Sequence, residues 1–390
     1  MTENVQRNRE MEVNLLAAAK DAQWSAGTFL GAGSTKLVSP AKVNLVLAVG
    51  PRRDDGYHDV QTVMHGLALH DTVYLHAEEL SEDELARTAA ELAEAQAALA
   101  QAEEDARAQD VPAEQATAAA RARVPRAAAL LDARAVGGPA DNLLVEIDLS
   151  DRTGQDLTVP TADNLAFKAA DRLARTVGRD APEKVSLRIE KHIPAQGGLG
   201  GGSSNAAAVL VGLASKWGLA VDDPRILEVA QGLGADVAFF LQGGCRLFEG
   251  VGEREVRTLA PSRQAVVLVR PQAGVSTAAC YRRFDEDPQE VDARALSVME
   301  RAEDAASLVL ANNLGPAAEA LLPELAVVRQ WLGECVGEGN VLLCGSGSTT
   351  FALVDSFDQA SALAVEASKQ GWWARPTNLS GLRAAMVPGR

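Results

Sequence analysis

The residues best suited to chemistry lie in one glycine-rich segment, PAQGGLGGGSSNAAA, at residues 194–208. Glycines allow positive φ angles and let backbone N–H groups crowd around an anion, and a helix that begins there adds its own free N–H groups. An apolar helix directly after the loop favours phosphate binding over a flexible linker, which is the alternative. The candidate phosphate-binding residues are Gly197, Gly198, Gly200, Gly201, Gly202, Ser203 and Ser204.

This segment fits neither common nucleotide-binding fingerprint. A Walker A loop requires Gly-Lys followed by Ser or Thr, and here Ser203 directly follows Gly202. The dinucleotide pattern GxGxxG fails as well, because Ser203 occupies its sixth position when Gly198 and Gly200 fill the first two glycine positions. The sequence therefore disfavours both a P-loop and a Rossmann fold.

The elements around the loop must hold it in place. Residues 163–178 have apolar side chains at helical spacing, with Asp163 as the expected N-cap. Residues 185–193 alternate like a half-buried strand that leads into the glycines, and helices are expected at about 204–217 and 224–233.

Strands are also predicted on both sides of this region. Residues 37–49 indicate a strand, and a turn at 54–56 separates it from residues 60–77, which fit one or two strands or a short helix plus a strand. Residues 265–271 predict a buried strand, and residues 341–354 predict a strand, a tight turn and a second strand.

Residues 78–140 differ in composition, being rich in Ala and Glu, with Leu85, Leu92 and Leu99 seven positions apart. Pro112 interrupts the pattern, so a helical hairpin inserted into the fold is expected, and a solvated, partly disordered insertion is the alternative. Residues 1–36 are interpreted as an N-terminal extension.

Composition limits the function further. The 390 residues carry 37 Lys plus Arg and 53 Asp plus Glu, so the net charge is −16, which argues against nucleic acid or an anionic membrane as a partner. The four cysteines have neither disulfide-framework nor zinc spacing, no histidine spacing indicates a metal site, and no apolar run is long enough to span a membrane. A cytoplasmic protein is expected, and the sequence indicates no particular oligomeric state.

Three motifs together resemble the GHMP kinases, a superfamily that binds ATP in a glycine loop unrelated to Walker A. GLGGGSSNAA at 198–207 resembles the second motif of that superfamily, SPAKVNL at 39–45 the first, and CGSGSTTF at 344–351 the third. DGYHDVQTVMHGLALHDTV at 55–73 resembles the signature of one branch, whose substrate is 4-diphosphocytidyl-2-C-methyl-D-erythritol.

The resemblance implies an α/β fold of the α+β type with two domains, one like ribosomal protein S5 and one ferredoxin-like. The first domain would span residues 37–260, with the helical insertion at 78–140, and the second would span 261–390. The implied activity is direct, in-line transfer of phosphate from ATP, with Mg²⁺, to the 2-hydroxyl of this cytidyl-diphosphate sugar alcohol in the non-mevalonate isoprenoid pathway.

The resemblance also assigns the reacting residues. Asp236, in LGADVAFF, matches the catalytic aspartate that takes or orients the hydroxyl proton, whereas without the motif an Asp after Gly-Ala is more typical of a turn or cap. Lys42 matches a conserved cation, and pairing with Asp236 would offset the cost of placing it on a buried strand. Asn44 would share its side of the strand and bind the substrate hydroxyls or Asp236.

Substrate and nucleotide contacts follow from the same matches. Tyr57 and His58 match a pair that binds cytosine, Tyr281 or Phe284 would stack on the other face of the base, and Thr277 would touch the substrate. Asn164 and Leu165 match positions near adenine, although residues 141–143 repeat the tripeptide Asp-Asn-Leu. Lys191 would approach the nucleotide. Mg²⁺ would arrive with ATP and keep most of its water, so no dedicated protein site is expected.

Two other functions remain as alternatives. One is a GHMP kinase for another alcohol, such as homoserine or mevalonate, which the presence of Tyr57 and His58 disfavours. The other is a catalytically silent nucleotide-binding regulator, which the presence of Lys42 and Asp236 disfavours.

Overall fold

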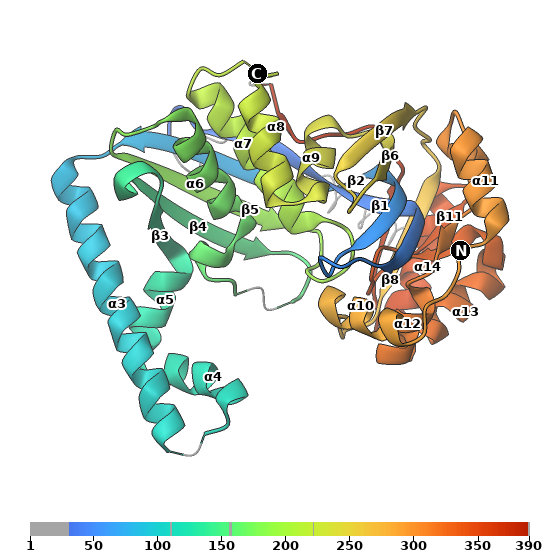
Figure 1. The fold of residues 1–390 in the computed structure, drawn as a ribbon, viewed down its shortest axis with the longest axis horizontal. Coiled ribbons are helices and arrows are strands. Elements are labelled where there is room, and N and C mark those ends of the chain that lie inside the picture. The colour runs from blue at the N-terminus through green and yellow to red at the C-terminus, as the bar shows by residue number, and fades with distance from the viewer. Residues whose placement is uncertain (1–30, 110, 156–157, 221, 389–390) are drawn as a thin grey trace, which may run out of the picture.

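The structure is a computed structural model that describes residues 31–109, 111–155, 158–220 and 222–388. The extension expected over residues 1–36 thus lies almost entirely outside the described residues. The described strands form one nine-stranded sheet and one four-stranded sheet (Figure 1). Among the described helices, none combines the length and the hydrophobicity that a membrane span requires.

The larger sheet is built on a long antiparallel hairpin of β1 (Thr35–Arg52) and β2 (His58–Glu79). Residues 60–77 therefore belong to one strand, the first of the forms left open by the sequence. The main strand order is β13-β1-β2-β5-β4-β3, with β6 and β9 paired to β2 and β1 and β7 paired to β6. The other strands are β3 (Arg134–Gly137), β4 (Leu143–Asp151), β5 (Glu183–Lys191), β6 (Cys245–Glu249), β7 (Arg254–Leu259), β9 (Ala311–Asn312) and β13 (Ala385–Met386).

Four helices pack on this sheet through a shared apolar core that includes Phe239 and Phe240. They are α6 (Leu165–Val177), α7 (Gly201–Lys216), α8 (Pro224–Leu233) and α9 (Ala235–Gln242). Two expectations need correction. The N-cap of α6 is Asn164 rather than Asp163, because the Asn164 side chain accepts from the N–H of Ala166 at 2.9 Å. Helix α7 begins within the glycines, about three residues before the expected start, so the loop and the helix share backbone N–H groups.

The Ala- and Glu-rich segment forms an ordered helical arm that projects away from both sheets (Figure 1). Helix α3 (Glu82–Ala108) starts at a capping box between Ser81 and Glu84 and packs against α4 (Ala113–Arg123) and α5 (Pro125–Ala133). Leu85 and Leu92 of α3 are buried. The predicted helical hairpin is therefore confirmed, and a disordered insertion is wrong for the described residues.

The smaller sheet has the order β10-β11-β8-β12. Alternate residues of its strand β8 face in opposite directions: Val267 and Val269 pack beneath helices α13 and α14, and Val266 and Leu268 face the first sheet. The remaining elements are β8 (Ala265–Arg270), α10 (Thr277–Glu286), α11 (Ala293–Arg301), α12 (Gly315–Leu321), α13 (Glu324–Val336), β10 (Val341–Leu343), β11 (Thr350–Val354), α14 (Phe357–Lys369) and β12 (Trp373–Asn378).

A second apolar core joins the two sheets, and it contains Val43 and Leu45 of β1 together with Phe351 and Trp373 of the smaller sheet. The predicted α+β architecture with an inserted hairpin is confirmed. The division of the chain at residue 260 stays a prediction, since β9 and β13 follow that position and pair with β1.

Candidate active site

The three motif segments, far apart in the sequence, meet at one end of this shared core. The backbone N–H of Lys42 donates to the carbonyl of Leu199 at 3.0 Å, and the N–H of Thr349 donates to the carbonyl of Gly197 at 3.2 Å. Together they enclose a cavity of about 230 Å³. Its lining includes Lys42, Asn44, Thr62, Gly198, Gly200, Asp236, Thr277, Tyr281, Gly345 and Ser346.

The glycine loop has a shape that other residues would not adopt. Gly198 and Gly200 have φ angles of +74° and +73°, in the left-handed region. A Cβ atom on Gly198 would lie 2.1 Å from the carbonyl oxygen of Cys344, so the loop and the third motif are in direct backbone contact. Gly200 is the N-cap of α7 and supplies no side-chain cap, which leaves first-turn N–H groups free for an anion.

The two serines after the glycines have different surroundings. Ser204 is fully buried and accepts a hydrogen bond of 2.9 Å from the Ser39 hydroxyl, so its own hydroxyl does not face the cavity. Ser203 is half-buried, and its hydroxyl makes no hydrogen bond within the described part of the chain. Of the two expected hydroxyl ligands, only Ser203 is available to a phosphate or a metal ion.

Opposite the loop, Lys42 and Asp236 form an ion pair, with 3.6 Å between Nζ and Oδ2. The Lys42 ammonium also donates to Asn44 Oδ1 at 2.7 Å, and Asn44 Nδ2 donates to the hydroxyl of Thr62 at 2.8 Å. Asp236 lies in the first turn of α9, where the helix dipole stabilises a carboxylate. The result is an oriented cation and a partly open carboxylate in one cavity.

The Tyr57 and His58 side chains point to different places. Tyr57 follows the hairpin turn and is 64% exposed, so its ring is free to stack. His58 is buried, its Nδ1 lies 3.0 Å from the carbonyl of Gly50, and its Nε2 lies 3.2 Å from Asp285. Both nitrogens of the imidazole therefore already face acceptors within the protein.

Helix α10 contributes Thr277 and Tyr281 to the lining of the cavity. The Tyr281 ring lines the cavity, with its centroid 5.2 Å from that of His58, and burial raises the pKa of its phenol to about 12, so the ring stays uncharged. Phe284 is 2% exposed and belongs to an apolar core, which favours Tyr281 as the stacking residue. The Thr277 hydroxyl lies 2.9 Å from that of Ser346, at the edge of the same cavity.

The three residues expected near the nucleotide have structural partners. Asn164 caps α6, and the Leu165 side chain lies next to Gly202, at the start of α7. Lys191 is buried, pairs with Asp71, and donates to the side-chain oxygen of Asn205 at 2.9 Å. Its ammonium is thus occupied beneath the loop, where it holds the first turn of α7.

Sequence reasoning missed four residues of this region: Thr62, Asp71, Asp285 and Ser346. Asp71 is fully buried and also accepts from the backbone N–H groups of His192 and Ile193 at 2.7 and 2.8 Å, so it anchors the chain where it enters the glycine loop. The sequence could have indicated Ser346, because this residue lies within the third motif at residues 344–351.

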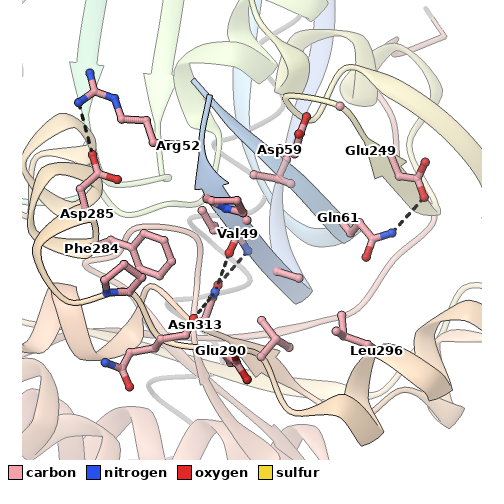
Figure 2. A pocket seen from close by; sticks show the side chains of 18 of the residues that line it. Val49, Arg52, Asp59, Gln61, Glu249, Phe284, Asp285, Glu290, Leu296 and Asn313 are labelled. Atoms are coloured by element: carbon pink, nitrogen blue, oxygen red, sulfur yellow. Dashed lines mark hydrogen bonds and ion pairs between the residues drawn. The ribbon is translucent and has the colours of Figure 1, made fainter. Parts of the chain in front are cut away.

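A larger depression of about 1110 Å³ lies against the tip of the β1–β2 hairpin (Figure 2). Its polar side chains largely pair with one another, as Arg52 does with Asp285 and Gln61 with Glu249. It contains neither Lys42 nor Asp236 nor any residue of the glycine loop. The small cavity is therefore the candidate active site. The described residues hold no group of three or more His, Cys, Asp or Glu side chains arranged for a metal ion.

Two family models match parts of the chain. A family model described as the GHMP kinases N terminal domain matches residues 164–244, and one described as GHMP kinases C terminal matches residues 293–371. The first match begins at Asn164, in the second copy of the repeated tripeptide.

Two of the proteins similar to this chain over most of its length have the same name. The 4-diphosphocytidyl-2-C-methyl-D-erythritol kinase of Pelotomaculum thermopropionicum is 32% identical over 328 residues, covering 83% of this chain and 90% of that protein. The kinase of the same name from Xanthobacter autotrophicus is 32% identical over 352 residues, covering 87% and 97%.

Solved structures extend the similarity to the fold. A crystal structure of 4-(cytidine 5'-diphospho)-2C-methyl-D-erythritol kinase is similar at a TM-score of 0.56 and 28% identity, covering 89% of this chain and 99% of that one. A homoserine kinase from Cytophaga hutchinsonii has a TM-score of 0.55 at 16% identity, a likeness of fold alone.

Proposed function

The chain belongs to the 4-diphosphocytidyl-2-C-methyl-D-erythritol kinases of the GHMP kinase family, and from this premise we propose that it phosphorylates the 2-hydroxyl of 4-diphosphocytidyl-2-C-methyl-D-erythritol with ATP. This would be a step of the non-mevalonate route to isoprenoid precursors. The observation that carries the proposal is the Lys42–Asp236 pair, 3.6 Å apart, in the same cavity as the glycine loop.

Separate groups of residues would bind ATP and activate the acceptor. Free N–H groups at the start of α7 would hold the ATP phosphates, and Asp236 would orient the acceptor hydroxyl and take its proton. Lys42, held by Asn44, would place a fixed positive charge beside the phosphoryl group during its transfer. Transfer would be in line and direct, because positioning and charge stabilisation account for most catalysis of this kind.

Mg²⁺ fits the residues that are present. The hydroxyl of Ser203, which has no partner among the described residues, and the partly exposed carboxylate of Asp236 are hard oxygen ligands of the kind that Mg²⁺ takes beside phosphates and water. When bound, the ion would supply positive charge to the phosphate oxygens.

The cytidine end of the acceptor would lie between the hairpin tip and α10. The exposed ring of Tyr57 and the cavity-lining ring of Tyr281 would stack on the base, and Thr277 would contact the polar part of the acceptor. Asn164 and Leu165 would lie near the adenine of ATP at the start of α6. We place the reaction in the cytoplasm, which the four free thiols support.

The test is ADP release by the full chain with MgATP and the cytidyl-diphosphate acceptor, with homoserine and mevalonate as competing acceptors. Asp236→Asn keeps the size of the side chain and removes the base, so kcat should fall by roughly 10²- to 10⁴-fold. Asp222→Asn, at an exposed carboxylate outside the cavity, is the matched control and should keep wild-type turnover.

Each failure has a separate meaning. Turnover with homoserine or mevalonate alone would replace the proposed acceptor. ATP binding without turnover of any acceptor would favour a silent nucleotide-binding regulator. Full turnover by Asp236→Asn would remove Asp236 from its proposed role.

A further inference from the structure

Arg270 stands at the end of β8, where the smaller sheet meets the glycine loop. Its Nε donates to the Ser348 hydroxyl at 3.0 Å, and the backbone N–H of Ser348 donates to the carbonyl of Gln196 at 3.1 Å. A Cβ atom on Gly274 would lie 3.4 Å from Arg270 Nη2 and 2.6 Å from Gln196 Oε1. The guanidinium therefore lies between Ser348 of the third motif and Gln196, just before the glycine loop.

Among the residues that the structure describes, no acid pairs with the charge of Arg270. Three Lys or Arg residues are buried in the described part of the chain, and two of them face a carboxylate: Lys42 faces Asp236 and Lys191 faces Asp71. Arg270 is 2% exposed and pairs with no described acid. Burial alone lowers its pKa, with no carboxylate acting in the other direction.

This arrangement lowers the stability of the ligand-free protein, because a buried charge without a partner is strongly destabilising. A guanidinium presents five N–H donors in a planar fork that matches phosphate oxygens, and among the described residues only its Nε has a partner. The polyphosphates proposed to bind at the adjoining loop carry the opposite charge.

We propose that Arg270 is the counter-cation of phosphate groups bound at the glycine loop, so that its charge is neutralised by ligand rather than by protein. The proposal rests on the proposed function for the presence of phosphates at the loop. Two sources share this chemistry, the triphosphate of ATP and the diphosphate of the acceptor.

The experiment compares full-length Arg270→Met and Arg270→Lys with Arg375→Met. Arg375 is an exposed arginine on the neighbouring strand β12, so its loss changes the net charge equally without emptying the buried position. We would measure unfolding without ligand, the stabilisation given by MgATP and by the acceptor separately, and the KM of each.

Arg270→Met should be as stable as the wild type or more stable without ligand, while ligand stabilisation shrinks and one KM rises about tenfold, as expected for one lost charge-assisted contact. Arg270→Lys should recover part of this loss, and Arg375→Met should match the wild type. A rise in the KM for ATP alone assigns the triphosphate, and a rise for the acceptor alone assigns the diphosphate.

Loss of stability in Arg270→Met, with both KM values and both ligand stabilisations unchanged, would reduce Arg270 to a structural residue and overturn the proposal. Where stability falls and a KM also rises, Arg270→Lys decides: recovery of the KM supports the proposal, and no recovery overturns it. If the wild type does not turn over, the proposed function fails, and ATP stabilisation of Arg270→Met against Arg375→Met still tests the charge of Arg270.

Discussion

The ammonium group of Lys42 lies 3.6 Å from the carboxylate of Asp236 and donates a 2.7 Å hydrogen bond to Asn44. The Lys42 side chain is 5% exposed and that of Asp236 is 35% exposed, so the pair opens to the cavity on the side of the carboxylate. A cation fixed in a wall of low dielectric acts more strongly on a nearby phosphoryl group than one in water.

Replacing Lys42 with Met should therefore lower kcat about 100-fold or more, because a fixed charge beside the transferred group is lost. Asp236 keeps its access to solvent, so the variant should fold. Steady-state kinetics with both substrates is the measurement, and an unfolding curve is the control. A variant that retains more than about a tenth of wild-type kcat would contradict the electrostatic role of Lys42.

Gly198→Ala should disrupt the glycine loop. The new Cβ would meet the carbonyl oxygen of Cys344, and the residue would be held at a φ of +74°, which disfavours any side chain. We expect ATP affinity to fall at least tenfold, as measured by titration calorimetry.

Gly218→Ala separates the effect of φ strain from the effect of the close contact with Cys344. Gly218 has a φ of +68°, but a Cβ there would have no atom within 4 Å. It should lose only about 1–2 kcal/mol of stability through φ strain and keep its ATP affinity. Equal loss of ATP affinity in both variants would mean that the close contact with Cys344 is unimportant.

Base stacking can be assigned by comparing three aromatic residues. Tyr57→Ala and Tyr281→Leu should each raise the KM for the acceptor, by roughly 5- to 100-fold, and leave the KM for ATP unchanged, since stacking on one base contributes about 1–3 kcal/mol. Phe284→Leu should instead lower stability, because Phe284 is in the core. A selective rise of the acceptor KM in Phe284→Leu but not in Tyr281→Leu would reverse the assignment.

His65 should make stability depend on pH. It is fully buried, its Nδ1 contacts the carbonyl of Gly66, and its Nε2 accepts from the N–H of Ser262 at 2.9 Å, so the folded state needs the neutral ring. Burial lowers its pKa from the ordinary value of 6.5.

Since the unfolded chain then binds the proton first, stability is complete above about pH 6.5 and falls as the pH drops below that value, by at most about 1.4 kcal/mol per pH unit. Urea unfolding at pH 7.5 and pH 5.5 measures this loss. His65→Gln, which keeps an acceptor for Ser262 and does not titrate, should show a smaller difference; an equal difference would assign the effect to other groups.

Local patterns were enough for much of the fold. The alternation at residues 185–193, the spacing in residues 163–178 and the leucines of α3 each predicted an element that the structure contains, because helix and strand periods are set within a few residues. The order of the three motifs also pointed to the family. The glycines indicated an anion-binding loop from local sequence alone, because the backbone freedom of glycine does not depend on distant segments.

Only the tertiary structure decided which side chains are available to a ligand. Ser203 and Ser204 are adjacent in the sequence, yet the Ser204 hydroxyl is hydrogen-bonded to Ser39 and the Ser203 hydroxyl has no partner in the described part of the chain. Lys191 is held by Asp71 of a neighbouring strand, and Arg270 pairs with no acid among the described residues. Side-chain spacing fixes the face on which a residue lies, but the partner that binds its charge comes from a distant segment, and strand pairing and helix packing in the complete fold bring those segments together.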